Sequence, residues 1–427
     1  MKIMKEKELK YSVVGMSRFA HISDVHLGAM TGKLREVNIQ CFVDSLDIAL
    51  NRNVDFIIIS GDLFENTLPD ISSVRKGISK MKEIKDNGIN IYAIPGSHDY
   101  SINNSSIFDL LESAGLFENV FKFKYDNDRL ILKPTIDKKT NVAIYGISAR
   151  KLGLEEDYFK YLGGYDDYDS FKIFLFHSAV TEIAIDTKYF GKDIPVSLFP
   201  KNMNYYAGGH IHKKIVKNIE GMKFFYPGPI FGADFNDLEN YANGEERGFF
   251  IVEFDDDVKN YEFIKNEKYI PLLIDVDVNN KDSLTAYKEI IEKIEEYDVY
   301  NKIVLLKIHG ELNSGKTTDI NKVKIKDKIL NAGGIDVRIS FNVSVRKLEK
   351  YFENELSRDE IHKKVFSENI NKLKFNENNL DGLNGISLAM DLINILSIEQ
   401  GENESNIDYN NKIKKEAFKR LGINYDD

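Results

Sequence analysis

The sequence is short of three things: cysteine, long apolar runs and positive charge. Its one cysteine, Cys41, cannot form an internal disulfide, which favours a reducing environment with a buried thiol. No apolar run reaches roughly eighteen residues, the length that crosses a bilayer, so no membrane association is predicted. The N-terminal MKIMKEKELKYSVVG is charged and lacks the apolar core of a secretory signal. We therefore expect a cytoplasmic protein.

The charge balance limits the kind of nucleic-acid binding that is possible. Sixty-eight acidic residues outnumber 58 lysines and arginines, and the net charge is −10. A free-standing DNA-binding protein usually carries a basic face. If DNA is a ligand, the binding must be local or shared with a partner. The 427 residues exceed one ordinary core, so two or three domains are expected.

The first two thirds of the chain alternate between apolar runs and helical stretches, the pattern of a layered α/β domain. The runs are short and rich in Ile, Val, Phe and Tyr, as strands are. They span residues 18–23, 54–60, 89–95, 141–147, 171–176, 204–209 and 248–254. Between them, residues 71–88 carry apolar side chains at spacings of three and four, which predicts an amphipathic helix that Gly88 ends.

Two further segments follow this domain. Residues 271–278, 302–308 and 336–345 read as strands with helices between them, which predicts a small α+β module. The last eighty or so residues hold no strand-like run and predict helices near 358–373, 384–398 and 408–421. The expected division is an extension at 1–17, a catalytic domain at 18–262, the small module at 268–345 and a helical tail at 346–427.

Five of the eight histidines lie just beyond an apolar run. In a layered α/β protein the carboxyl ends of the strands meet at the site crevice, so these side chains should converge. A lone histidine is more often structural, but five at equivalent positions accompanied by aspartates are not easily explained that way. The candidates are Asp24, His26, Asp62, Ser97, His98, His177, His210 and His212.

The local spacings point to metal binding. Asp24 and His26 lie two residues apart, as do His210 and His212, and strand alternation would place each pair on one side. Mixed imidazole and carboxylate ligands suit Mn, Fe or Zn. Two ions about 3.5–4 Å apart, bridged by a carboxylate, clamp a phosphate and lower the pKa of bound water for in-line attack. The pattern thus predicts a phosphoesterase.

These motifs resemble the calcineurin-like metallophosphoesterase superfamily, whose order is DxH, GD, GNH(D/E), a lone His and GHxH. The resemblance implies two β-sheets sandwiched between helices. Within the superfamily, HISDVHLG, SGDLF, PGSHDYSINNSSIFDLLESAG and YPGPIFGADFNDLE are most similar to the double-strand-break-repair nuclease subunit, the meiotic recombination eleven family with its SbcD-type relatives. The later segments resemble that family only in layout, as its DNA-capping domain and the segment that binds an SMC-like coiled-coil ATPase.

The resemblance also implies residue roles. Asp24, His26, Asp62 and His212 would hold one metal ion, manganese being the expected metal. Asp62, Ser97, His177 and His210 would surround a second, with Asp62 bridging. His98 would stabilise the phosphate or protonate the leaving group, and Asp99 would orient His98 or brace its loop. His21 is interpreted as structural, and His309 and His362 as surface residues.

Two positions depart from the family pattern. Ser97 stands where the family usually has asparagine, and Glu65 stands where some members have a phosphate-facing histidine, so that role is not carried over. Separately, GELNSGKT at 310–317 matches the P-loop expression. Too few strands follow it for a nucleotide-binding sheet, and no magnesium-binding Asp ends the next run, so we interpret it as a Gly-rich turn.

Three functions therefore remain open from the sequence. The first is a DNA exo/endonuclease that works as a homodimer, paired through helices near 70–86 and 106–117, with the ATPase and DNA as partners. The second is a phosphatase or cyclic-nucleotide phosphodiesterase, against which the additional module and tail argue. The third is a scaffold subunit with a weakened metal site, which Ser97 motivates.

Overall fold

The computed structural model describes residues 16–101, 105–150, 154–187, 193–346, 357–370, 382–401 and 404–423. The chain divides into two compact units, Met1–Arg346 and Lys347–Asp427. The first fifteen residues lie outside the described part, and with them most of the expected 1–17 extension. Among the described residues, no helix is both long and apolar enough to cross a membrane.

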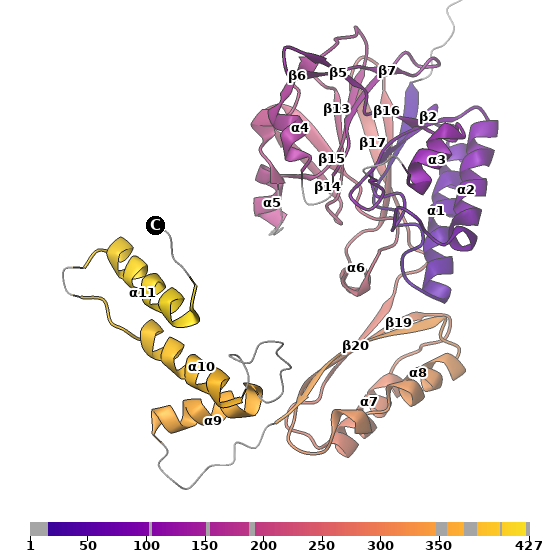
Figure 1. Ribbon diagram of the computed structural model, residues 1–427. Coiled ribbons are helices and arrows are strands. Elements are labelled where there is room, and N and C mark those ends of the chain that lie inside the picture. Colours follow the sequence, from indigo (N-terminus) through magenta and orange to yellow (C-terminus); the bar gives the residue numbers. More distant parts are fainter. Residues whose placement is uncertain are drawn as a thin grey trace, which may run out of the picture. The chain divides into compact units, whose positions relative to one another are not determined.

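Two six-stranded sheets form the centre of the first unit (Figure 1). The first has the order β17-β16-β1-β2-β3-β4 and the second β14-β15-β13-β10-β8-β7. The strands of the first sheet are β1 (Ser17–Ile22), β2 (Phe56–Ser60), β3 (Asn90–Ile94), β4 (Glu118–Asn119), β16 (Gly248–Phe254) and β17 (Val258–Lys265). Those of the second are β7 (Thr135–Ile136), β8 (Ala143–Ile147), β10 (Lys172–His177), β13 (Tyr205–Gly209), β14 (Ile215–Ile219) and β15 (Met222–Tyr226).

Helices cover the outer faces of both sheets, so the layered α/β prediction is confirmed. The helices on the first sheet are α1 (Lys33–Asn51), α2 (Ile71–Asp86) and α3 (Ile107–Ser113), and α6 (Phe235–Ala242) joins the same hydrophobic core. The second sheet packs against α4 (Glu156–Lys160) and α5 (Thr181–Thr187). Shorter strands complete the domain: β5 (Phe123–Asp126), β6 (Arg129–Leu132), β9 (Leu162–Tyr165), β11 (Ala179–Val180) and β12 (Asp193–Ile194).

A third core lies between the two sheets and explains why the strands read as continuous apolar runs. Strand β2 is buried along its whole length: Ile57 and Ile59 face the helices, while Phe56 and Ile58 face the other sheet. Strands buried on both faces have no polar side to show. His21 lies in this middle layer, where its ring nitrogens contact the Tyr205 and Ser60 hydroxyls at 2.9 and 2.8 Å. It is structural, as expected.

The small α+β module also forms as the sequence predicts. Its parallel sheet has the order β18-β19-β20 and packs against two helices. The elements are β18 (Leu272–Asp277), α7 (Ser283–Glu295), β19 (Ile303–Leu312), α8 (Lys322–Asn331) and β20 (Asp336–Val345). The module contacts the larger domain through the Lys307–Glu239 ion pair at 2.7 Å and through hydrogen bonds from Arg338 to Thr31.

The P-loop-like segment belongs to this module and lacks the geometry of a phosphate cradle. Strand β19 continues through Gly310 to Leu312, and Thr317–Asp319 form a single 3-10 turn. Helix α8 begins only at Lys322, so its N-terminus does not follow the Gly-Lys pair. A P-loop needs the strand to lead through the glycine-rich turn directly into a helix. The interpretation as a Gly-rich turn stands.

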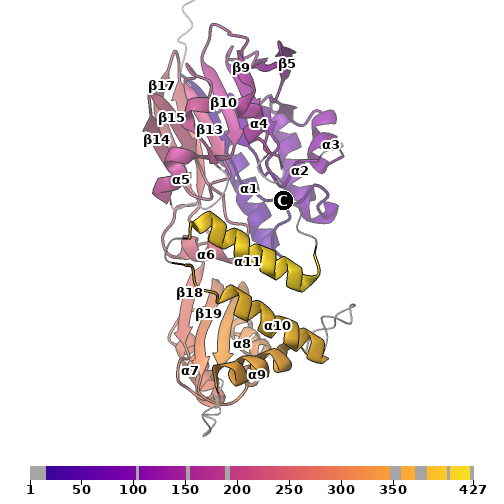
Figure 2. The same ribbon diagram turned by 60° about the vertical axis from the view of Figure 1, so that its left-hand side comes forward.

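The second unit is helical in its described part. It comprises α9 (Arg358–Ile370), α10 (Gly382–Leu396) and α11 (Asn406–Leu421), close to the three predicted helices (Figure 2). Helix α10 contacts both of the others. Several large apolar side chains of this unit are exposed: Ile361, Val365, Leu383, Leu396, Leu421 and Ile423.

Candidate metal centre

The candidate ligands gather where strands of the two sheets end. Asp24 follows β1, Asp62 follows β2, Ser97 follows β3, His177 ends β10 and His210 follows β13. Because β1, β2 and β3 run parallel, as do β8, β10 and β13, their carboxyl ends meet at one edge. The expected convergence is therefore present in the structure.

The reason for this convergence differs from the one expected. Strand alternation was expected to align Asp24 with His26, yet β1 ends at Ile22 and both residues lie in the left-handed region, each at φ 50°. Asp62 at φ 49° and His210 at φ 86° share that region. Strained backbone of this kind persists only where surrounding contacts enforce it, and it gathers at functional sites. The alternation argument was wrong, and loop geometry aims these side chains.

Hydrogen bonds between two neighbouring loops enforce that backbone. The amides of Asp24 and His26 donate to the carbonyls of Gly61 and Asp62 at 3.1 and 2.9 Å. Gly61 is required at its position, because a Cβ atom there would lie 2.1 Å from Nδ1 of His177. These hydrogen bonds thus join the loops after β1 and β2 next to the site.

Asp62 is the centre of the cluster. Its Oδ2 lies 3.0 Å from Nε2 of His177, 3.8 Å from Nε2 of His26 and 3.4 Å from the Ser97 hydroxyl. Its Oδ1 accepts the amide of His98 at 2.8 Å. One carboxylate thus faces both expected halves of the site. The neighbouring imidazoles hold the pKa of Asp62 below its usual value despite its burial.

The first half of the site contains Asp24, His26 and His212. The Nε2 atoms of the two imidazoles lie 3.2 Å apart, and Nε2 of His212 lies 3.9 Å from Oδ1 of Asp24. The three side chains offer ligand atoms within 4.8 Å of one another. Both rings thus turn the same nitrogen towards a shared point.

Two carboxylates that were not among the predicted site residues orient these imidazoles. Oε2 of Glu65 lies 2.8 Å from Nδ1 of His26, and Oδ2 of Asp237 lies 2.8 Å from Nδ1 of His212. A carboxylate on the far nitrogen fixes the tautomer and makes Nε2 a stronger metal ligand. Arg247, which is fully buried, secures Asp237 by donating to its carbonyl and to that of His212 at 2.8 and 2.7 Å.

The second half of the site contains Asp62, His177, His210 and Ser97. Nδ1 of His177 contacts the Ser60 carbonyl at 2.9 Å, so Nε2 points at Asp62. The His210 ring lies 5.3 Å from the His177 ring, and its amide donates to Asp24 Oδ1 at 2.9 Å. Asp24, Asp62 and His177 form a second group with ligand atoms within 4.8 Å. Asp24 therefore reaches both halves.

His98 and Asp99 are adjacent in the chain but have different surroundings. The His98 side chain is 43% exposed, and its Nδ1 lies 2.8 Å from the Glu65 carbonyl, which leaves Nε2 on the opposite side of the ring. Asp99 is fully buried, and its carboxylate accepts the amides of Leu63, Phe64 and Gly96 at 2.8–3.0 Å. Asp99 therefore braces the loop and does not contact the His98 ring.

Unpartnered buried atoms and local charge test whether divalent ions fit here. Oδ2 of Asp24 is buried and has no hydrogen-bond partner among the described residues, and Nε2 of His177 has none beyond its 3.0 Å contact with Asp62. Such atoms are costly unless something else satisfies them. Burial lowers the pKa of His177 and His212, but the surrounding carboxylates outweigh it and raise the values to about 10 and about 9. A pocket that favours added positive charge so strongly suits divalent cations.

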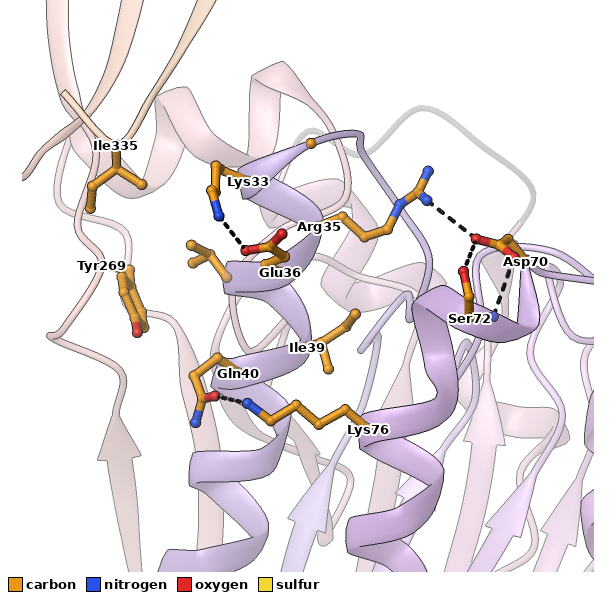
Figure 3. A pocket seen from close by; sticks show the side chains of 12 residues that line it. Lys33, Arg35, Glu36, Ile39, Gln40, Asp70, Ser72, Lys76, Tyr269 and Ile335 are labelled. Carbon is orange, nitrogen blue, oxygen red and sulfur yellow. Dashed lines mark hydrogen bonds and ion pairs between the residues drawn. The ribbon is translucent and has the colours of Figure 1, made fainter. Parts of the chain in front are cut away.

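A nearby cavity does not share this chemistry. It has a volume of about 760 Å³ and is lined by residues of α1 and α2, by Tyr269 before β18 and by Ile335 before β20 (Figure 3). Of its charged side chains, Lys33 pairs with Glu36 at 2.8 Å, Arg35 pairs with Asp70 at 3.8 Å, and Lys76 donates to Gln40. We place no reaction there.

Comparison with known proteins finds a matching family and related sequences. Residues 17–214 match the calcineurin-like phosphoesterase family. The DNA double-strand break repair protein Mre11 of Archaeoglobus fulgidus is 26% identical over 335 residues, covering 72% of this chain and 70% of the relative. The Mre11 protein of Methanopyrus kandleri is 27% identical over 261 residues, which cover 58% of this chain and 57% of the relative. The Mre11 protein of Methanococcus maripaludis is 29% identical over 303 residues, which cover 68% of this chain and 76% of the relative.

Residues 17–214, with their fold and ligand cluster, form a domain similar to the calcineurin-like, metal-dependent phosphoesterases. Within that class it is similar to the Mre11 double-strand break repair proteins, although the match to one of them spans little more than half of that relative.

Proposed function

We propose that the chain is a manganese-dependent DNA exo- and endonuclease subunit of a double-strand-break-repair complex. The observation that carries the proposal is the Asp62 carboxylate, which lies within 3.0–3.8 Å of donor atoms of His177, Ser97 and His26. The relatives named for double-strand break repair supply the substrate class.

Different side chains have different proposed roles in phosphodiester hydrolysis. Asp24, His26, Asp62 and His212 would hold one ion, and Asp62, Ser97, His177 and His210 the other. Divalent ions bound there would polarise the phosphate and supply hydroxide from bound water at neutral pH. His98 would contact the phosphate or protonate the leaving oxygen through Nε2, because its ring is 43% exposed and its Nδ1 contacts the Glu65 carbonyl.

The direct test is digestion of blunt duplex and single-stranded DNA with saturating manganese, with and without the coiled-coil ATPase. We expect cleavage by the parent chain and none by the His98→Gln or Asp62→Asn variants. A parent that binds two metal ions but cleaves neither DNA, while Ser97→Asn gains activity, would support the scaffold function. Hydrolysis of small phosphate esters without DNA cleavage would support the phosphatase alternative.

We also propose that the chain pairs as a homodimer through the region of α2 and α3. Leu68, Ile71 and Leu110 are 77%, 67% and 62% exposed and line a cavity of about 530 Å³. The expected stripe on α2 is used mainly inside the protein, since Val74, Met81 and Ile84 are fully buried. Burying the exposed residues between subunits is favourable by about 25 cal/mol per Å². A monomeric mass by light scattering at micromolar protein would exclude this dimer.

The tail is proposed as the binding site for the ATPase. Several of its large apolar side chains are exposed, among them Leu383 at 82% and Leu396 at 63%. A helical unit with this much exposed apolar surface suits docking onto another helix. A chain ending at residue 345 should no longer co-purify with the ATPase but should keep its metal centre. Undiminished co-purification would place the contact elsewhere.

A further inference from the structure

A row of aromatic side chains with one arginine runs beside the metal centre. It comprises Tyr100, Arg150, Tyr158, Phe121, Phe123 and Tyr125, which we call the aromatic row. The guanidinium of Arg150 lies 5.9 Å from the Tyr100 ring and 5.1 Å from the Tyr158 ring. Ring centroids then follow at 5.0 Å from Tyr158 to Phe121, 4.9 Å from Phe121 to Phe123 and 5.5 Å from Phe123 to Tyr125.

The row begins at the loop that carries Ser97 and His98. The amide of Tyr100 donates to the Gly96 carbonyl at 3.1 Å, which closes that loop. The amide of Ala149 donates to the Pro95 carbonyl at 3.2 Å, which fixes the chain just before Arg150 against the same loop. Tyr100, Phe121 and Arg150 follow the carboxyl ends of β3, β4 and β8. The row therefore starts at the catalytic edge and continues onto the small sheet of β5, β6 and β9.

The chain alternates aromatic and basic residues where it enters β5. Phe121, Phe123 and Tyr125 share one face, while Lys122 and Lys124 alternate with them and pair with Glu118 and Asp166. The Tyr125 side chain is 69% exposed. Phe121, Phe123 and Tyr158 are partly buried and pack against the core of the second sheet, but that core does not require an exposed tyrosine continuing the series.

Arg150 supplies a partly buried positive charge within the row. No ion pair involves its guanidinium among the described residues, and its Nε has no hydrogen-bond partner there. Its backbone amide, not its side chain, contacts Glu155, at 3.1 Å. An arginine held between two tyrosine rings is pre-organised, so it loses little freedom when it meets an anion. Aromatic rings next to such a cation form the combination that binds unpaired bases and their phosphates.

We propose that the aromatic row is a stacking platform for unpaired bases of a DNA strand that leaves the metal centre, with Arg150 contacting its phosphate. The inference rests on the proposed nuclease function and specifies the form of its substrate. Bases in a duplex hide their faces against one another, so the platform favours single-stranded ends and flaps. It also locates the local contact that a chain of net charge −10 needs for DNA.

The test measures binding of the full chain to oligo(dT) carrying 2-aminopurine, in EDTA so that no cleavage occurs. The variants are Tyr125→Ala and Tyr158→Leu, with Tyr158→Phe to restore a ring. Tyr161→Ala is the matched control, because Tyr161 is 60% exposed at the end of α4 and lies outside the row. For Tyr125→Ala and Tyr158→Leu we expect binding at least roughly fivefold weaker than that of the parent, with less quenching of the 2-aminopurine fluorescence. The control and Tyr158→Phe should keep the parent values.

Unchanged affinity and quenching in both Tyr125→Ala and Tyr158→Leu would overturn the platform. An equal loss of affinity for blunt duplex would also overturn it, since that result indicates a general DNA or protein-docking surface. Because the measurement needs no catalysis, it is separate from the proposed function. A parent that fails to cleave DNA in manganese contradicts the nuclease function, whereas a cleaving parent with unaffected variants contradicts only the platform.

Discussion

The two halves of the metal centre are built differently. In the half with Asp24, His26 and His212, a carboxylate holds the far nitrogen of each imidazole at 2.8 Å. In the half with His177, the corresponding partner is the neutral Ser60 carbonyl, and the fourth position is a serine hydroxyl 3.4 Å from Asp62. Carboxylate partners raise ligand basicity more than a carbonyl does. The comparison teaches that the first half should bind metal more tightly than the second.

The largest effect should come from Asp62, the carboxylate at the centre of both halves. Asp62→Asn removes a charge that faces His26, His177 and Ser97 together. We expect more than roughly 100-fold loss of nuclease activity and weaker binding of both ions, because a shared ligand should matter more than an outer partner. Manganese titration followed by a cleavage assay measures both. Loss of only one ion would show that Asp62 does not bridge.

The next largest effect should come from Asp237, the carboxylate that contacts Nδ1 of His212. Asp237→Asn keeps the shape of the side chain and removes its charge, so Nε2 of His212 becomes a poorer ligand. We expect roughly tenfold or weaker manganese binding in the first half, with the second half little changed. Thermal unfolding of the metal-free variant checks the fold, since Arg247 lies 3.8 Å from Asp237. A variant that lowers both affinities equally would contradict the division into halves.

Glu65→Gln makes the matched change behind His26 and should have a smaller effect. The Glu65 side chain is 27% exposed, against 7% for Asp237, so water can partly replace its contact with Nδ1 of His26. We expect a loss of affinity in the first half of less than about tenfold. Isothermal titration with manganese compares the two variants directly. A larger effect at Glu65 than at Asp237 would reverse the assigned order.

The smallest change should be a gain, at Ser97. Asparagine offers an amide oxygen one bond further from the backbone, and an amide carbonyl is a better metal ligand than a neutral hydroxyl. Ser97→Asn should therefore tighten the second half and lower the manganese needed for half-maximal activity by up to about tenfold, the change that about 1.4 kcal/mol produces. An identical manganese dependence in parent and variant would mean that Ser97 does not limit binding.

The sequence predicts the candidate metal ligands better than it predicts the residues that support them. Asp24, Asp62 and His177 are recognisable because each comes at or just after the end of an apolar run. Asp237 supports a histidine 25 residues earlier in the chain, and no local spacing indicates that contact. Glu65 was noticed only as a departure from a family pattern, and its contact with His26 depends on how two loops pair.

The fold shows the same division between local and long-range information. Apolar runs place the strands and the spacing of Val74, Met81 and Ile84 places α2, because burial on a sheet is a local pattern. The left-handed backbone at Asp24 and His26 could not be inferred, since it depends on hydrogen bonds to the loop after β2. The aromatic row likewise joins four segments that only the tertiary structure brings together.

The most direct test of the unequal halves is a titration of the metal-free full chain with manganese. Electron paramagnetic resonance measures the concentration of free manganese at each step of the titration. The account predicts two ions per chain bound in two distinct steps. Asp237→Asn should weaken the tighter step, and Ser97→Asn should strengthen the weaker one. Two ions binding with equal affinity, or Ser97→Asn strengthening the tighter step, would contradict the account.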